Sequence, residues 1–93
     1  MLLRALAISP ETSIALRCAR YQKQLGLHSE ALIMLGFAYA RSPRRNEVAL
    51  EFAQSLIDAR IPVRAAQVVD EILGRSPSDS MALRLKDCLE NER

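Results

Sequence analysis

The chain has 93 residues, of which 49% are hydrophobic and only 4% are aromatic, and it carries 13 basic and 11 acidic residues. Its length predicts a single small domain over residues 1–93, and a core rich in Ala, Leu, Ile and Val with few rings favours helices over strands. The net charge of +2 is too small to indicate a nucleic acid or an anionic membrane as partner. We therefore expect an all-α domain that binds neither.

Residues 1–8 predict a short helix that is apolar on more than one side. A transmembrane helix needs about 20 apolar residues, and Arg4 interrupts this stretch, which also lacks the basic start and longer apolar run of a secretory signal. We therefore expect a cytoplasmic protein. We also expect Leu2, Leu3 and Leu6 to contact a partner rather than only their own domain.

A second helix is expected at 10–25, because Ser9 can cap it and Pro10 suits its first position. Gly26 suits the left-handed position just after its end. Apolar and small residues then recur at helical spacing and predict a buried stripe. They are Ile14, Ala15, Cys18, Ala19, Tyr21 and Leu25.

The next helix is expected to begin with Ser29 as its cap and to end at Ser42-Pro43, since the residue before a proline avoids the helical region. Arg41 suits its last turn. Its predicted buried stripe consists of Ala31, Leu32, Leu35, Ala38 and Tyr39.

Three further helices complete the predicted fold. One spans 44–59, one is opened by Pro62 and closed by Gly74, and the last spans 78–91 after Ser76-Pro77. Short connections require consecutive helices to pack antiparallel. Their predicted inner residues are Val48, Ala49, Phe52, Ala53 and Leu56; Ala65, Ala66, Val69, Ile72 and Leu73; and Met81, Ala82, Leu85 and Leu89.

The Ser-Pro pairs mark a period in the sequence. Ser42 follows Ser9 by 33 residues, and Ser76 follows Ser42 by 34. A period near 34 is typical of repeated helical hairpins. A shift of 34 also superposes alanines where two helices of a hairpin would approach closely. These pairs are Ala15 and Ala49, Ala19 and Ala53, and Ala31 and Ala65.

This pattern resembles the tetratricopeptide repeat. The second-helix half of that motif has a small residue, an apolar residue four later and a proline twelve later, as at Ala31, Leu35 and Pro43 and again at Ala65, Val69 and Pro77. The first-helix half is degenerate, since Ala15 and Ala49 stand where the family has Trp. The resemblance implies two full repeats, 10–43 and 44–77, between a short N-terminal helix, 1–8, and a C-terminal capping helix, 78–91.

Catalytic motifs are lacking, so we do not expect an enzyme, a cofactor or a bound metal. The sequence has no Gly-rich phosphate loop and no nucleophile elbow. His28 has no second ligand or nucleophile at a motif spacing and fits a turn. Cys18 and Cys88 lack a CxxC spacing and are expected to stay reduced.

The resemblance implies instead a concave surface lined by the first helix of each hairpin. The Lys and Asn that clamp a peptide carboxylate in this family are replaced by Leu16, Leu50 and Glu47, which favours an apolar groove for an amphipathic helix. Leu16 and Leu50 fit the hydrophobic core about equally well. The predicted groove residues are Leu16, Arg20, Lys23, Leu50, Gln54, Ile57 and Met81.

Size, repeat and cap pattern together resemble the needle-subunit chaperones of bacterial type III secretion. That resemblance implies a cytoplasmic chaperone that holds the amphipathic helix of a needle protein in its groove and prevents premature polymerisation. A second small helical co-chaperone would then contact Leu2, Leu3 and Leu6 in a hetero-oligomer. The alternative is a general repeat scaffold or regulator that binds an acidic segment through Arg20, Lys23, Arg44 and Arg45.

Overall fold

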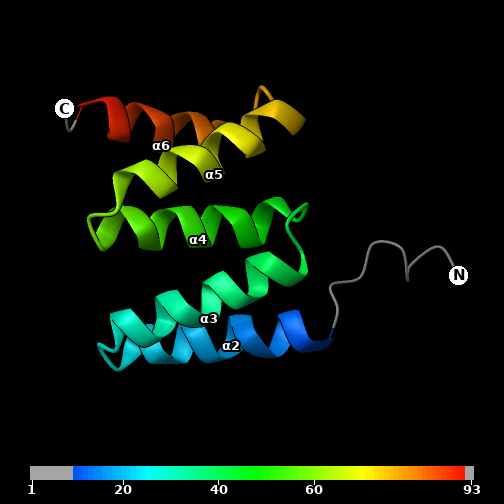
Figure 1. Cartoon of the computed structure of the whole chain (residues 1–93), viewed down its shortest axis with the longest axis vertical. Helices are drawn as coiled ribbons and strands as arrows, with labels where there is room; N and C mark the ends of the chain where they lie inside the picture. Colours follow the sequence, from blue (N-terminus) through cyan, green and yellow to red (C-terminus); the bar gives the residue numbers. More distant parts are fainter. Residues whose placement is uncertain (1–9, 92–93) are drawn as a thin grey trace, which may run out of the picture.

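The computed structural model describes residues 10–91, and helices are the only regular structure in that range. They are α2 (Pro10–Gln24), α3 (His28–Arg41), α4 (Asn46–Asp58), α5 (Pro62–Arg75) and α6 (Ser80–Asn91). The helices form a stack with α2 at one end and α6 at the other (Figure 1). The predicted all-α class is therefore confirmed. The helix predicted at 1–8, with Leu2, Leu3 and Leu6, and the cap predicted at Ser9 lie outside the described residues.

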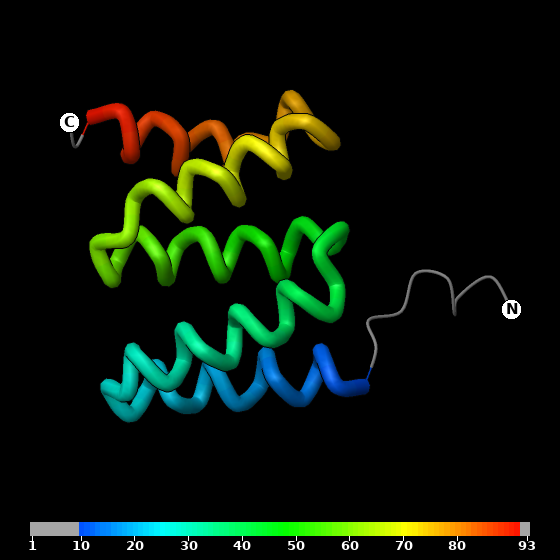
Figure 2. Tube along the Cα trace, in the orientation of Figure 1, coloured from blue at the N-terminus to red at the C-terminus, as the bar shows by residue number. Residues whose placement is uncertain are grey.

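Successive helices run in opposite directions, as the trace in Figure 2 shows. α2 packs most extensively on α3 and α4 on α5, and α3 also contacts α4. Ala19, Ala31, Ala53 and Ala65 are completely buried. Their small side chains allow the two helices of each hairpin to approach closely, as the sequence predicts.

The burial pattern of the first hairpin recurs 34 residues later. Matching positions are buried in both hairpins, which means that the two use the same helix faces for their packing. The buried pairs are Ala15 and Ala49, Ala19 and Ala53, Ala31 and Ala65, Leu35 and Val69, and Ala38 and Ile72.

The serine of each Ser-Pro pair ties the end of a hairpin to its beginning. The Ser42 hydroxyl, at the end of α3, lies 2.9 Å from the Thr12 hydroxyl in the first turn of α2. The Asn46 amide of α4 donates to the Ser76 hydroxyl at 3.0 Å, and the Arg75 guanidinium donates to the Asn46 carbonyl oxygen at 3.0 Å. The Ser-Pro punctuation therefore marks a polar contact that closes each hairpin, besides a chain break.

Several predicted helix ends are confirmed. Ser42 is the C-cap of α3, and Pro62 occupies the first turn of α5. Asp79 accepts a hydrogen bond of 2.9 Å from the backbone N–H of Ala82, which satisfies a free donor at the start of α6.

Two predicted helix ends are wrong. Ser29 is not a cap, because α3 begins at His28 and its flanking residue is Leu27. Gly74 does not close α5, which continues to Arg75. Gly74 lacks the positive φ that a left-handed cap requires. The helix instead ends where Pro77 restricts the residue before it.

The stripe predicted for α2 is buried only in part. Ala15 and Ala19 are buried, whereas Ile14, Tyr21 and Leu25 are exposed. Cys18 is exposed as well. The described helices contact only one side of α2, which is the first of them in the stack (Figure 1).

The turns inside the two hairpins share one geometry. Gly26 has φ +81°, and the Leu27 N–H donates to the Gln22 carbonyl at 2.8 Å. Arg60 has φ +63°, and the Ile61 N–H donates to the Leu56 carbonyl at 2.9 Å. Both hydrogen bonds have the six-residue pattern of a Schellman motif, whose left-handed position favours glycine.

Opposite substitutions at these two turns should therefore have opposite effects. We expect Gly26→Ala to lower the free energy of unfolding by about 1 kcal/mol, because a Cβ disfavours the left-handed region. Arg60→Gly should raise it by a similar amount. Urea denaturation followed by circular dichroism measures both. A loss of stability in Arg60→Gly would contradict the assignment.

Candidate functional site

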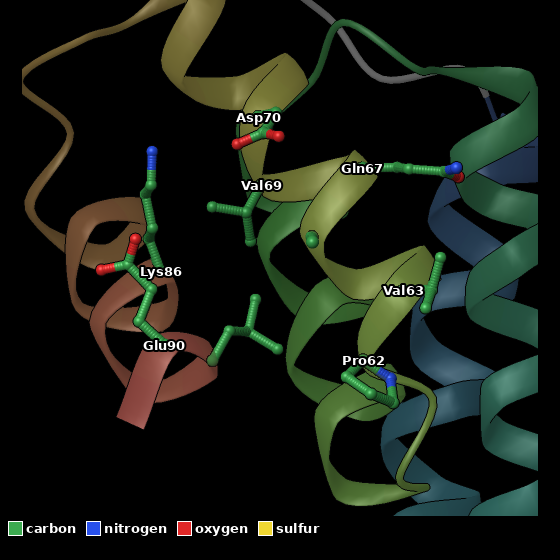
Figure 3. A pocket seen from close by; sticks show the side chains of 9 residues that line it. Pro62, Val63, Gln67, Val69, Asp70, Lys86 and Glu90 are labelled. Atoms are coloured by element: carbon green, nitrogen blue, oxygen red, sulfur yellow. The ribbon is translucent and has the colours of Figure 1, made fainter. Parts of the chain in front are cut away.

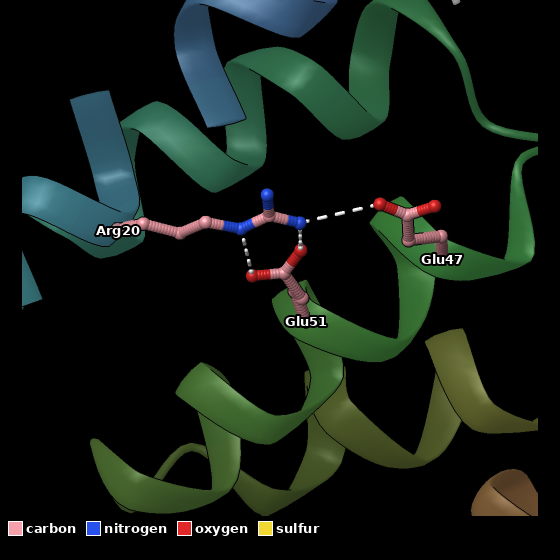
Figure 4. Close-up of polar contacts among 3 residues, drawn as sticks. All are labelled: Arg20, Glu47 and Glu51. Carbon is pink, nitrogen blue, oxygen red and sulfur yellow. Dashed lines mark hydrogen bonds and ion pairs between the residues drawn. The ribbon is translucent and has the colours of Figure 1, made fainter. Parts of the chain in front are cut away.

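Arg20 of α2 reaches across to two glutamates of α4 (Figure 4). Its guanidinium contacts Glu51 through two nitrogens, at 3.3 and 2.6 Å, and Glu47 at 3.2 Å. The hydrogen bond and charge of Glu51, and to a smaller degree those of Glu47, raise the pKa of Arg20 above its usual value. Arg20 therefore joins the first helices of the two hairpins and already has two carboxylate partners.

The structure places Leu16 in the hydrophobic core. Its side chain is only 4% exposed, so its assignment to an open groove is corrected. Leu50 and Ile57 are half-buried and pack against the same core, while Met81 of α6 is exposed. The apolar side chains that remain accessible on the predicted groove therefore come from α4 and α6.

The polar groove residues lie beside this apolar group. Lys23 is half-buried, and Gln54 is exposed and donates a hydrogen bond to Asp58 at 3.1 Å. Glu47, Glu51, Gln54 and Asp58 follow one another at steps of four, three and four residues, which places them on one face of α4. The sequence analysis missed this acidic row, although its helical spacing was visible.

Other apolar side chains are exposed away from the predicted groove. Ile33 and Phe37 of α3 are exposed one turn apart, and Arg41 stacks over the Phe37 ring at 5.1 Å. The exposed residues of α2 described above lie on a different helix. The signal that could have revealed these positions is hydrophobicity on a helix face opposite the conserved small residues of the period.

A cavity of about 550 Å³ opens between α5 and α6 (Figure 3). Val63, Val69 and Leu89 supply apolar walls, and Asp70, Lys86 and Glu90 contribute charges around it. Lys86 stands 34 residues after Phe52, the ring that fills the corresponding space between α3 and α4. The cavity is therefore the less tightly filled counterpart of that junction.

The remaining polar candidates do not form a chemical site among residues 10–91. His28, Cys18 and Cys88 are exposed, and no group of three or more His, Cys, Asp or Glu side chains in this range is arranged to hold a metal ion. The predicted basic cluster is partly engaged, since Arg41 lies 3.5 Å from Glu11. Arg44 and Arg45 line the shallow turn at Ser42 and Pro43.

Comparison with known proteins leaves the argument with the residues themselves. No protein-family profile, no curated protein and no solved structure matches the chain. Within the part that the structure describes, no helix is both long enough and apolar enough to cross a membrane.

Proposed function

We propose that this chain is a cytoplasmic chaperone built from tetratricopeptide-like hairpins, which binds the amphipathic helix of a small polymerising subunit. The needle-subunit chaperones of type III secretion, which the sequence resembles, provide the specific form of the proposal. The observation that carries it is the group formed by Leu50, Ile57 and Met81, which we call the α4–α6 patch. It is the accessible apolar part of the predicted groove.

The α4–α6 patch has the spacing that helix capture needs. Leu50 and Ile57 are seven residues apart on α4 and so lie on one face, two turns from each other. An amphipathic helix offers apolar anchors at matching spacing. Burying one such side chain contributes about 1.5–3 kcal/mol, so three anchors are enough for tight binding after the cost of association.

The acidic row of α4 refines the expected partner. Glu47, Glu51 and Asp58 lie beside the half-buried Leu50 and Ile57, and only Arg20 is paired with any of them in the described part of the chain. We therefore expect the captured helix to carry basic residues next to its apolar stripe, since like charges across an interface are costly.

The alternative, a scaffold for an acidic segment, has less support. It relies on Arg20, Lys23, Arg44 and Arg45, yet Arg20 is engaged by Glu47 and Glu51. Salt separates the two functions, because binding through exposed charges weakens as ionic strength rises. Apolar capture on the α4–α6 patch should persist in high salt.

Two apolar residues of α6 provide a matched test. Met81 is 45% exposed and Leu83 is 47% exposed, but they point to different sides of the helix because two positions turn it by about 200°. We expect Met81→Asp to weaken partner binding at least tenfold, and Leu83→Asp to leave it within about twofold. The tagged chain and its variants would be co-purified from the native host, and the partners identified by mass spectrometry and titrated by calorimetry.

The expected partners are two helical proteins of small size, one of which polymerises when released. Recovery of only large or disordered partners would overturn the chaperone proposal. A stable, dispersed monomer that binds nothing in its host would overturn it too. Equal losses in Met81→Asp and Leu83→Asp would show that the α4–α6 patch is not the binding site.

A further inference from the structure

An apolar stripe runs along the outer side of α2. Ile14, Tyr21 and Leu25 are 60%, 62% and 56% exposed, and Cys18 is exposed between them. Steps of four, three and four residues place these four residues, the α2 outer stripe, on one helix face. In Figure 1, α2 forms the end of the stack, and no helix of the described range lies beyond it.

The equivalent face of α4 is covered by α3. Thirty-four residues after Ile14, Cys18 and Tyr21 stand Val48, Phe52 and Ser55, all of them buried. The Phe52 ring lies 5.2 Å from the Tyr39 ring and approaches Gly36, where an added Cβ would be 3.6 Å from it. The α2 outer stripe therefore corresponds to a surface that receives a helix of the α3 type.

The sequence of residues 1–8 has the pattern of such a helix. Aligning Ser9-Pro10 with Ser42-Pro43 places Arg4 on Phe37, an exposed position of α3. The same alignment places four apolar residues on the side of α3 that is buried or half-buried. These matches are Leu2 with Leu35, Leu3 with Gly36, Ala5 with Ala38, and Leu6 with Tyr39.

We propose that residues 1–8 dock as a helix on the α2 outer stripe over Ile14 and Cys18, as α3 docks on α4. Eight helical residues span about 12 Å, so they can cover only the first half of the stripe. Tyr21 and Leu25 then remain open to a second chain. By analogy with the connection at 42–45, docking requires Pro10 and Glu11 to leave the first turn of α2.

This inference goes beyond the proposed function and does not depend on it. It assigns Leu2, Leu3 and Leu6 to a contact within their own chain, where the sequence analysis assigned them to a co-chaperone. The two cysteines make the difference measurable. Cys18 lies on the proposed contact, while Cys88 is exposed on α6 at the opposite end of the stack (Figure 1).

The test is alkylation of the full-length chain by iodoacetamide, with each cysteine followed by peptide mass spectrometry. Dividing each rate by its value in denaturant removes intrinsic differences between the two thiols. We expect Cys18 to react at least tenfold more slowly than Cys88, at every protein concentration. Leu6→Asp should remove this protection, whereas Arg4→Glu should keep it, because position 4 falls on the exposed side.

Each other result overturns the proposal. Equal rates for Cys18 and Cys88 in the native chain mean that nothing covers the stripe. Protection that fades on dilution identifies a second copy as the occupant, and protection that appears only with an added partner identifies that partner. Protection that survives Leu6→Asp shows that residues 1–8 do not provide it.

Discussion

Replacing Leu35 by alanine is expected to lower the free energy of unfolding by about 3 kcal/mol. Leu35 is among the largest of the completely buried side chains and lies in α3, between the other helices of the core. Truncation removes its transfer free energy and leaves a cavity that close-packed neighbours fill only in part. Urea denaturation followed by circular dichroism measures the loss.

The matched control is Ile33→Ala in the same helix. Ile33 is 71% exposed, so this substitution should change stability by less than about 0.5 kcal/mol. Comparable losses in the two variants would mean that α3 buries a different face, and would contradict the packing described here.

Helix positions were largely predictable because their signals are local. Ser-Pro pairs, the glycine after α2 and the periodic alanines each act within a few residues, and the five observed helices begin and end within a few residues of the predicted ones. The errors at Ser29 and Gly74 have a local reason as well. Each residue type has two possible roles near a helix end, and composition does not select between them.

The exposed face of α2 was harder to predict, because amphipathic periodicity does not show which neighbours are present. Ile14 and Tyr21 have the pattern of core residues, and their equivalents in α4 are indeed buried. A helix at the end of a stack keeps that pattern while losing the neighbour that would cover it. Leu16 shows the converse, since its burial depends on packing in the described stack that its own helix does not encode.

The polar part of the candidate site depends on contacts between distant residues. Arg20 meets Glu47 and Glu51, which lie 27 and 31 residues later in the chain. A single sequence shows the three charges but not their distances, so Arg20 resembled a free cation. The acidic row on α4, in contrast, follows from helical spacing alone.

The junction between the two hairpins should be the most sensitive part of the fold. Phe52 of α4 is buried against Tyr39 and Gly36 of α3, and Arg64 of α5 lies over both rings at 5.9 Å. One side chain thus joins three helices. We expect Phe52→Ala to lower the free energy of unfolding by about 3–5 kcal/mol. Since small domains have only about 5–15 kcal/mol in total, this variant should be close to unfolding.

Phe37→Ala is the control for the loss of an aromatic ring. Phe37 is 45% exposed and is contacted by Arg41 on the surface, so its removal should cost less than about 1 kcal/mol. Thermal and urea denaturation of both variants test the comparison. A smaller urea slope in Phe52→Ala would show that the hairpins no longer unfold together. A mild effect of Phe52→Ala, with the slope unchanged, would mean that α3 and α4 are held together elsewhere.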